Sequence, residues 1–496
     1  MGVYVDKVIL VRVGELSVKR GYTRKEMERL LLNAMKEAAE ECGGAKFAWE
    51  PGRFYAWGDV DCLKRVLSRV FGIKSVSPAY LVKFNNLEEV VEVAARLWGD
   101  EVRGRRFAVR VRRWGTHDFT SLDAAAKIGA ALVSAGGKVD LEQPEVELYV
   151  EIRGKRAFFY TEVLEGPGGL PLGSEGKVLA LVSGGIDSPV AAWMMMRRGA
   201  HVDVFYCNLG GTLALRRVLE VVKTLLSWSY GYNARVAVAD CGPLARAIRR
   251  GVREELWNIA FKRGLYLAAA EVARMVKAVA LATGESLGQV SSQTLQALAA
   301  VERGLEMPLL RPLIGMDKDE IVKLAQRIGT YELSTRLPEY CAVFSRRPKK
   351  WATREEVEEI DLAIRDAVEE VVKSVKMLRK RELDEYIKSL TPPQDLEIGE
   401  LPPDAVVVDL RDEESYRRWH LPGAVRANPE DVLSLVDRMG RDKTYVFYCY
   451  GGGLSLDVAE SLRKLGIKAY SIRLWRTSSQ AQQRDTTSRE EISGDA

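Results

Sequence analysis

Short apolar runs and amphipathic helical stretches follow one another along the first part of the chain. An apolar start at 3–10, a helical pattern around 24–32 and a second apolar run at 46–49 predict strand, helix and strand. Residues 1–60 are therefore expected to form a small α+β domain.

The same alternation of strand and helix patterns continues over 61–165, with more charged residues. The expected elements are a helix after Asp61, a turn at Ser77-Pro78, a helix over 87–98, an alternating strand over 107–114, and a hairpin of 146–152 with 157–160. A connector rich in glycine and proline at 166–173 then predicts a domain boundary.

Apolar strands alternate with longer helical patterns over 176–390, for example at 202–206 and 278–283. Strands that are apolar on both faces and separated by helices predict a doubly wound parallel sheet. A charged helix is expected from Arg354 to Leu390.

A linker at 391–403 precedes a fourth domain at 404–475, with strands at 406–410 and 445–448. The polar tail 476–496 is expected to be disordered. The pattern as a whole predicts a multidomain α/β and α+β protein.

Composition narrows the class of protein. Of 496 residues, 47% are hydrophobic and 29% charged, and no run is long and apolar enough to cross a bilayer. Because the first residues also lack the features of a signal peptide, we expect a cytoplasmic protein. The net charge of +5 is too small to indicate nucleic-acid binding by itself.

Six cysteines are scattered along the chain without CxxC spacing, so neither a disulfide scaffold nor a zinc ribbon is indicated. They are Cys42, Cys62, Cys207, Cys241, Cys341 and Cys449. The three histidines His117, His201 and His420 are single and predict no metal site.

The most informative segment is an apolar strand that runs into a Ser-Gly-Gly-x-Asp-Ser turn. The turn consists of Ser183, Gly184, Gly185, Ile186, Asp187 and Ser188. Two glycines let backbone N–H groups and a helix N-terminus face an anion, while the hydroxyls add donors. The order differs from a Walker loop and favours release of pyrophosphate from an adenylated substrate. Any glycine-rich strand-to-helix turn is the alternative interpretation.

Three further segments are expected near that turn. The run from Ala282 to Thr294 is too polar for a core helix and follows a predicted strand, where open α/β sheets bind ligands. Lys262 precedes that strand and can meet a phosphate. Asp317 and Lys318 follow another expected strand and are further candidates.

Cys449 ends an apolar strand and is followed by a run of three glycines, which can turn backbone N–H groups toward a sulfur anion. With the segments at 409–411 and 420–424, this loop resembles a rhodanese domain. Because the loop has no arginine, phosphatase activity is not expected. A buried core cysteine is the alternative. Cys341 lies in a proline-containing loop and gains a role only if it resolves a persulfide on Cys449.

A basic strip accompanies the strand over 107–114. It comprises Arg103, Arg105, Arg106, Arg110, Arg112 and Arg113, with Trp114 beside it and Arg153, Lys155 and Arg156 on the hairpin. Such a strip can bind RNA phosphates or be an ordinary solvated face.

Together these motifs resemble the tRNA 4-thiouridine synthetase (ThiI, tRNA sulfurtransferase) family along nearly the whole chain. The segments around Gly14-Glu15-Leu16 and Val70-Phe71-Gly72-Ile73 are similar to its ferredoxin-like and THUMP domains, and 183–188 is similar to its PP-loop. The resemblance implies ATP contacts at Leu181, Val182, Lys262, Gly284 and Gln293, in addition to Ser183, Gly184, Gly185, Ser188 and Lys318.

The resemblance also implies a reaction. ATP with Mg²⁺ would adenylate uridine 8 of tRNA, with Asp187 in a catalytic role, and a cysteine desulfurase would load Cys449 with sulfur. Cys341 would then form a redox disulfide with Cys449, to be reset by a thiol reductant. The THUMP domain, with Arg105, Arg106, Arg110, Arg112 and Arg113, would bind tRNA. Transfer of sulfur to the carrier protein ThiS for thiamine synthesis is a further implied activity.

Three alternatives stay open from the sequence. One is a tRNA-binding protein whose nucleotide site is regulatory, and another is a PP-loop ligase acting on a small molecule. The third is thiolation through an iron–sulfur cluster, as in family members that lack the rhodanese domain and carry a CxxC pair.

Overall fold

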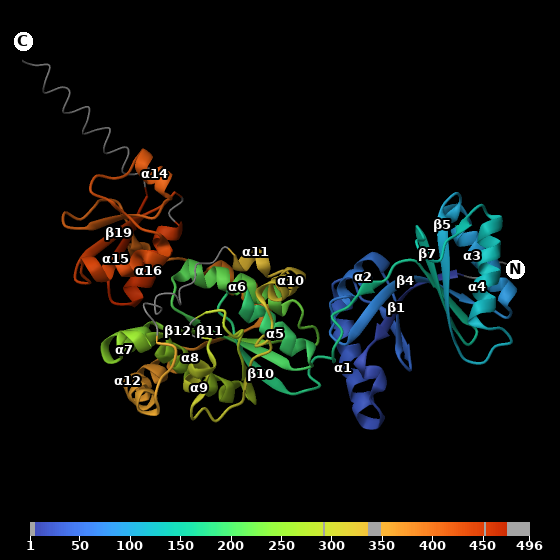
Figure 1. The fold of residues 1–496 in the computed structure, drawn as a ribbon, viewed down its shortest axis with the longest axis horizontal. Coiled ribbons are helices and arrows are strands. Elements are labelled where there is room, and N and C mark those ends of the chain that lie inside the picture. Colours follow the sequence, from blue (N-terminus) through green and yellow to red (C-terminus); the bar gives the residue numbers. More distant parts are fainter. Residues whose placement is uncertain (1–4, 291–292, 336–348, 451–452, 474–496) are drawn as a thin grey trace, which may run out of the picture. The chain divides into compact units, whose positions relative to one another are not determined.

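The computed structural model describes residues 5–290, 293–335, 349–450 and 453–473 (Figure 1). The chain divides into two compact units. The first unit comprises 1–175 with 196–200 and 228–232, and the second comprises 176–195, 201–227 and 233–496.

One nine-stranded sheet forms the first unit, in the order β2-β3-β1-β4-β8-β7-β5-β6, with β9 paired to β4. Its strands are β1 (Val5–Val13), β2 (Lys46–Glu50), β3 (Arg53–Trp57), β4 (Ile73–Lys83), β5 (Arg106–Trp114), β6 (Lys138–Val139), β7 (Val146–Arg153), β8 (Arg156–Tyr160) and β9 (Leu164–Glu165). Its helices are α1 (Gly21–Glu40), α2 (Val60–Leu67), α3 (Leu87–Val102) and α4 (Ser121–Ser134).

The four helices cover one face of this sheet. Helix α1 buries Met27, Leu31 and Met35 at helical spacing against Ile9 and Val11 of β1. Helices α3 and α4 pack on β5, β7 and β8 in the same way, with Trp98 and Ile128 in that core. Alternate residues of the strands point to the opposite face, which carries polar side chains that are described below.

The expected turn at Ser77-Pro78 is wrong, because both residues lie within strand β4. Proline lacks the N–H that a sheet ladder needs, so it is tolerated only where no partner requires that donor. Strand β9 pairs with β4 at Ser75 and Val76, whereas β8 pairs with it from Tyr80 onward. Pro78 falls in the gap between these two partners.

The second unit contains a six-stranded sheet in the order β14-β13-β10-β11-β12-β15, parallel except for β15. Its strands are β10 (Lys177–Leu181), β11 (His201–Asn208), β12 (Arg235–Asp240), β13 (Ala280–Ala282), β14 (Leu309–Leu310) and β15 (Lys376–Arg379). Its helices are α5 (Asp187–Arg197), α6 (Thr212–Leu226), α7 (Gly242–Gly251), α8 (Trp257–Val276), α9 (Leu295–Glu302), α10 (Lys318–Ile328), α11 (Tyr331–Ser334), α12 (Arg354–Lys373) and α13 (Leu383–Ser389).

This sheet confirms the predicted parallel α/β pattern, with Val202 to Tyr206 all buried. The single helix expected from Arg354 to Leu390 is wrong. Helix α12 ends at Lys373, and Lys376 to Arg379 pair antiparallel with the edge strand β12 before α13 begins. The charge-rich sequence hid a four-residue edge strand.

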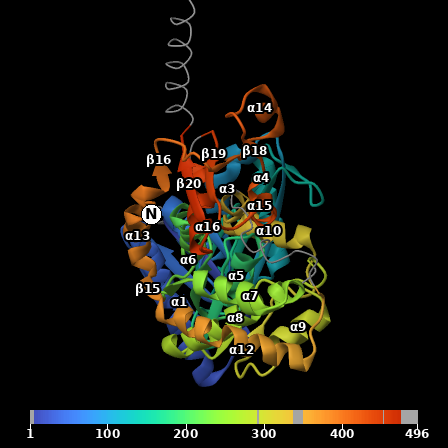
Figure 2. The same cartoon turned by 90° about the vertical axis from the view of Figure 1, so that its left-hand side faces the viewer.

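A five-stranded parallel sheet completes the second unit, in the order β16-β20-β19-β17-β18 (Figure 2). Its strands are β16 (Glu397–Ile398), β17 (Val406–Asp409), β18 (Val425–Arg426), β19 (Thr444–Tyr448) and β20 (Lys468–Ile472). Its helices are α14 (Glu413–Arg418), α15 (Val432–Met439) and α16 (Gly453–Lys464). No helix within the described residues is long and apolar enough to cross a membrane.

Two disulfides correct the expectation drawn from the scattered cysteines. Cys42 pairs with Cys62, and Cys207 pairs with Cys241. The second pair joins the carboxyl ends of β11 and β12, which are neighbouring strands, so the Cα atoms lie 5.4 Å apart although 34 residues separate them. Sequence spacing could not reveal this proximity, because the sheet order creates it.

Candidate active site

The Ser-Gly-Gly-x-Asp-Ser turn lies where β10 ends and α5 begins. Gly184 has a φ of +83°, a conformation that L side chains rarely adopt. The Ser183 N–H donates to Ser188 Oγ at 3.0 Å, and the two hydroxyl oxygens lie 3.3 Å apart. The turn therefore brings both serine hydroxyls together at the positive end of a helix, as an anion site requires.

The second nucleotide motif contacts this turn through Gly284. A Cβ atom at Gly284 would lie 2.6 Å from the Ser188 backbone nitrogen and 2.7 Å from Ser188 Cα. Only glycine lets the loop after β13 approach the first turn of α5 so closely. Gly284, where the expected motif begins, thus lies beside the turn.

Lys318 and Asp187, which the sequence offered separately, form an ion pair. Lys318 Nζ lies 2.6 Å from Asp187 Oδ1. Asp317 has a different role, because its carboxylate accepts from the Glu320 N–H and caps helix α10. The cap fixes the start of α10 and so places Lys318 over the turn.

A buried cluster around Glu285 supports the site, and the sequence reasoning missed it. Glu285 Oε1 accepts from Lys262 Nζ at 2.8 Å and from the Tyr266 hydroxyl at 2.5 Å. Its Oε2 accepts from Thr283 Oγ1 at 3.0 Å and from Arg311 Nε at 2.5 Å. Burial by itself would raise the pKa of Glu285, but Lys262 and Arg311 lower it to about 2.

The other expected ATP contacts lie at the end of β10 and in the loop after Gly284. Leu181 ends β10, and the Val182 N–H donates to the Phe205 carbonyl of β11. Gln293 is half-buried, and its Oε1 atom has no hydrogen-bond partner among the described residues, and neither has the buried Nε2 atom of Gln289. Buried amide atoms are normally hydrogen-bonded, so two such atoms without a partner fit a site that receives a polar ligand.

Cys449 follows β19 and is 6% exposed. Its Sγ atom lies 3.5 Å from Ser455 Oγ, and the Ser471 hydroxyl donates to Ser455 Oγ at 2.8 Å. Both serines are fully buried. The Ser455 hydroxyl, at the start of helix α16, therefore lies next to the sulfur, and the Ser471 hydroxyl of β20 bonds to Ser455. Gly451 and Gly452 lie outside the described residues, and so does Cys341.

A buried ion pair supports this loop from the side. Arg411 Nε donates to Asp409 Oδ1 at 3.0 Å, and Arg411 Nη2 donates to Asp409 Oδ2 at 2.7 Å. The guanidinium also lies over the rings of Trp419, Tyr448 and Tyr450, which flank the loop. Arg411 also donates to the Trp419 carbonyl, so the pair links the segment at 409–411 to the start of the segment at 420–424, and the sequence grouped both segments with Cys449.

Family models match the chain in four stretches. They are the ThiI ferredoxin-like domain over 8–77, the THUMP domain over 84–162, the thiamine biosynthesis protein (ThiI) over 173–365, and the rhodanese-like domain over 396–474. A tRNA sulfurtransferase of Pyrobaculum aerophilum is 73% identical over 467 residues, which cover 94% of this chain and 96% of that protein. The chain belongs to the tRNA sulfurtransferase family. A Thermoplasma volcanium member is 40% identical over 94% of this chain and 95% of its own.

Solved structures agree with the tRNA sulfurtransferase assignment. A 4-thiouridine synthetase in complex with RNA and ATP superposes with a TM-score of 0.66 at 29% identity, over 75% of this chain and 99% of its own. The protein PH1313 of Pyrococcus horikoshii gives 0.51 at 26% identity, over 65% of this chain and 100% of its own. The predicted ferredoxin-like, THUMP, PP-loop and rhodanese folds are thereby confirmed. The domain boundaries expected from the sequence stay predictions.

In this member of the family the basic strip follows strand β5, but acidic partners neutralise part of its charge. Arg106 pairs with Asp140 and Glu145, and Arg110 Nε lies 2.7 Å from Glu147. Arg105 donates to backbone carbonyls, and Arg113 lies 3.1 Å from His117 Nδ1. Arg112 is exposed on the helix-free face of the sheet. RNA binding by these residues stays a prediction.

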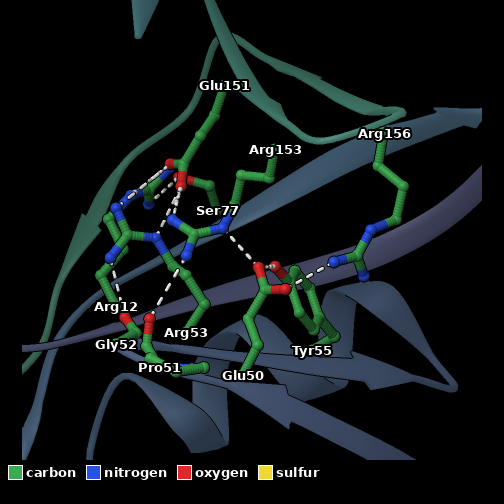
Figure 3. A network of polar contacts seen from close by, with 10 residues as sticks. All are labelled: Arg12, Glu50, Pro51, Gly52, Arg53, Tyr55, Ser77, Glu151, Arg153 and Arg156. Atoms are coloured by element: carbon green, nitrogen blue, oxygen red, sulfur yellow. Dashed lines mark hydrogen bonds and ion pairs between the residues drawn. The ribbon is translucent and has the colours of Figure 1, made fainter. Parts of the chain in front are cut away.

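The same face carries a buried network of charges (Figure 3). Four arginines surround two carboxylates: Arg12, Arg53 and Arg153 contact Glu151, and Arg153 and Arg156 contact Glu50. Burial would raise the pKa of Glu50, but hydrogen bonds from Tyr55 and Arg153 hold it below its ordinary value. The network ties the hairpin β2–β3 to β7 and β8, which lie several strands away in the sheet.

Proposed function

We propose that this chain is an ATP-dependent tRNA sulfurtransferase that converts uridine 8 of tRNA into 4-thiouridine. One observation supports the proposal above all: this chain carries both sites. They are the glycine-rich turn with its Lys318–Asp187 pair and the loop in which Cys449 contacts a buried hydroxyl. The two sites would divide the reaction into activation of the oxygen and supply of the sulfur.

In the first half, ATP is a substrate held at the turn from Ser183 to Ser188. Backbone N–H groups, the two hydroxyls and Lys318 would bind the phosphates, with the Asp187 carboxylate holding Lys318 in place. A Mg²⁺ ion bound with ATP would neutralise phosphate charge as well. Attack of the uridine O4 atom on the α-phosphorus would release pyrophosphate and turn a poor leaving oxygen into AMP.

In the second half, a cysteine desulfurase would load Cys449 as a persulfide. The terminal sulfur, as persulfide or as released sulfide, would attack C4 and AMP would leave. Cys341 would attack Cys449 Sγ, so that a Cys341–Cys449 disulfide forms and the transferred sulfur remains on the base. A dithiol reductant then supplies the two electrons and two protons that restore both thiols.

The first unit would hold the tRNA. Its helix-free sheet face has four arginines for two carboxylates in the network of Figure 3, and Arg112 is exposed beside it. Excess positive charge favours phosphate binding. The RNA in the 4-thiouridine synthetase complex supports the same substrate here.

Transfer of sulfur from Cys449 to the carrier protein ThiS is a second candidate activity. The match over 173–365 to a model described as a thiamine biosynthesis protein favours it. The same persulfide would serve both acceptors.

The test incubates the purified chain with unmodified tRNA, ATP-Mg²⁺, cysteine and a desulfurase, and measures 4-thiouridine in digested tRNA. The wild type is expected to form product, whereas Cys449→Ser and Cys341→Ser lose it and still release pyrophosphate. Product from both variants would contradict the relay. Retention of tRNA without any product would instead favour a binding protein with a regulatory nucleotide site.

A further inference from the structure

Helix α16, which begins directly after the Cys449 loop, contacts the first turn of α6 (Figure 2). Glu460 accepts from the Thr212 N–H at 2.6 Å and from Thr212 Oγ1 at 2.8 Å. Asp457 accepts from the Ala214 N–H at 2.9 Å and lies 3.1 Å from Arg217. The first N–H groups of a helix have no partner in their own helix, so these two carboxylates cap α6 from another domain.

Helix α6 has no side chain of its own to cap its first turn. Its N-cap residue is Gly211, which has no side chain to bond the first turn. A Cβ atom at Gly211 would lie 2.6 Å from Glu460 Oε2 and 2.9 Å from Glu460 Cβ. Glycine therefore provides no capping side chain, but it leaves the space that the Glu460 carboxylate of α16 occupies.

The far end of α16 is held as well. Arg246 of α7 donates to the Lys464 carbonyl, and Lys464 Nζ lies 3.9 Å from Asp240. Positive charge at the last turn of one helix and negative charge at the first turn of another both match the helix dipole. Asp457, Glu460 and Lys464 recur at helical spacing, so one side of α16 makes all these contacts.

This contact is costly, which argues for a specific role. Asp457 is 1% exposed, and burial raises its pKa to about 6, although Arg217 and the amides of α6 act in the opposite direction. An apolar side chain would be easier to bury than a carboxylate. Buried charges that match particular donors instead fix one arrangement of the two elements.

The contact between α16 and α6 lies at the same edge of the sheet as the nucleotide turn. Helices α6 and α7 begin after the carboxyl ends of β11 and β12, and β10, which carries the turn, is the neighbour of β11. Adjacent strands lie about 4.8 Å apart. Because Asp457 is the fifth residue of α16, it lies about 6 Å along the helix from the Cys449 loop, at about 1.5 Å per residue.

We propose that the cap formed by Asp457 and Glu460 on α6 is a delivery seat, which holds the Cys449 loop at the edge of the sheet where the tRNA oxygen is activated. This role rests on the proposed function. Without the seat, the sulfur-carrying domain would be tethered mainly by the segment between α13 and β16, and its local concentration at the acceptor would fall.

The test uses the full chain and two kinds of variant. Asp457→Ala/Glu460→Ala removes the cap, and Gly211→Ala displaces it from the α6 side. The control, Glu400→Ala/Asp404→Ala, removes two exposed carboxylates near the same domain. Hydrogen exchange of the α6 peptide 212–217 reports the seat, and single-turnover thiolation from preloaded Cys449 reports delivery.

Both seat variants are expected to exchange faster in 212–217 and to thiolate at least tenfold more slowly, while persulfide loading and pyrophosphate release stay within twofold of the wild type and of the control. Unchanged exchange would show that α16 is not seated on α6. Faster exchange with wild-type thiolation would overturn the delivery role. The wild type could also form no 4-thiouridine and still show protection of 212–217 that the variants lose. That result would overturn the proposed function and the delivery role, but the contact between α16 and α6 would stand.

Discussion

The nucleotide turn and the Cys449 loop are built alike but surrounded differently. Each follows a parallel strand, β10 or β19, contains glycines and leads into a helix. Around the first lie the Lys318–Asp187 pair and the charged cluster on Glu285. In the second, the Arg411–Asp409 pair supports the loop from the side, and the uncharged Ser455 hydroxyl lies next to the sulfur. We therefore expect the strand-turn-helix backbone to provide an anion site in both places, with the neighbouring side chains selecting phosphate in one and sulfur in the other.

The largest expected effect comes from adding one methyl group to the nucleotide turn. In Gly284→Ala the new Cβ would meet the Ser188 backbone, which cannot move without displacing the turn. Because displacement of about 1 Å can cost about 100-fold in rate, we expect ATP-dependent pyrophosphate release to fall by that order. Persulfide loading of Cys449 should be unchanged.

Gly315→Ala is the matched control, since its Cβ would meet nothing within 4 Å. Equal activity of the two variants would show that the close approach of the two nucleotide motifs is not needed.

The Glu285 cluster makes the nucleotide region sensitive to acid. The folded pKa of Glu285, about 2, lies below its ordinary value of 4.5, so its contribution to stability is present above pH 4.5 and is lost as the pH falls toward 2. A shift of this size corresponds to about 3 kcal/mol of unfolding free energy.

The stability difference between wild type and Glu285→Gln, measured by denaturant unfolding, should therefore shrink between pH 4.5 and 2. A difference that stays constant over that range would rule out the charged form of Glu285 as its source.

A smaller effect is expected for Lys318→Ala, which leaves the Asp187 carboxylate without its 2.6 Å partner and removes one phosphate-binding charge. The site is open to solvent, so we expect a loss of about tenfold in kcat/KM for ATP. Lys323→Ala, on the exposed side of the same helix α10, should have no effect on pyrophosphate release.

The smallest effect is expected from removal of the Ser455 hydroxyl next to the sulfur. Ser455→Ala removes the hydroxyl contact with Cys449 Sγ, a hydrogen bond of about 1 kcal/mol, and should slow persulfide loading about fivefold without changing pyrophosphate release. Ser461→Ala, on the same helix but bonded to the Asp457 carbonyl, is the control. If both variants load at the wild-type rate, the hydroxyl next to the sulfur has no part in holding it.

Local features of both sites could be predicted from the sequence. The strand before Ser183, the glycines and the helix after them are contiguous, as are the strand before Cys449 and α16. Asp187 and Lys318 were each predicted, although only the fold shows that they form a pair. The Glu285 cluster was missed because its members come from α8, the loop after β13 and the segment after β14.

The sequence by itself determined the candidate chemistry, because the turn from Ser183 to Ser188 and the Cys449 loop are each formed by neighbouring residues, whose types predict what they can bind. Tertiary structure decided which of those residues meet. Pro78 lies in a strand because β8 and β9 leave a gap beside it, Cys207 meets Cys241 because their strands are neighbours, and α16 caps α6 across more than 200 residues of chain. Such contacts depend on sheet order and domain packing, which no local pattern of side chains encodes.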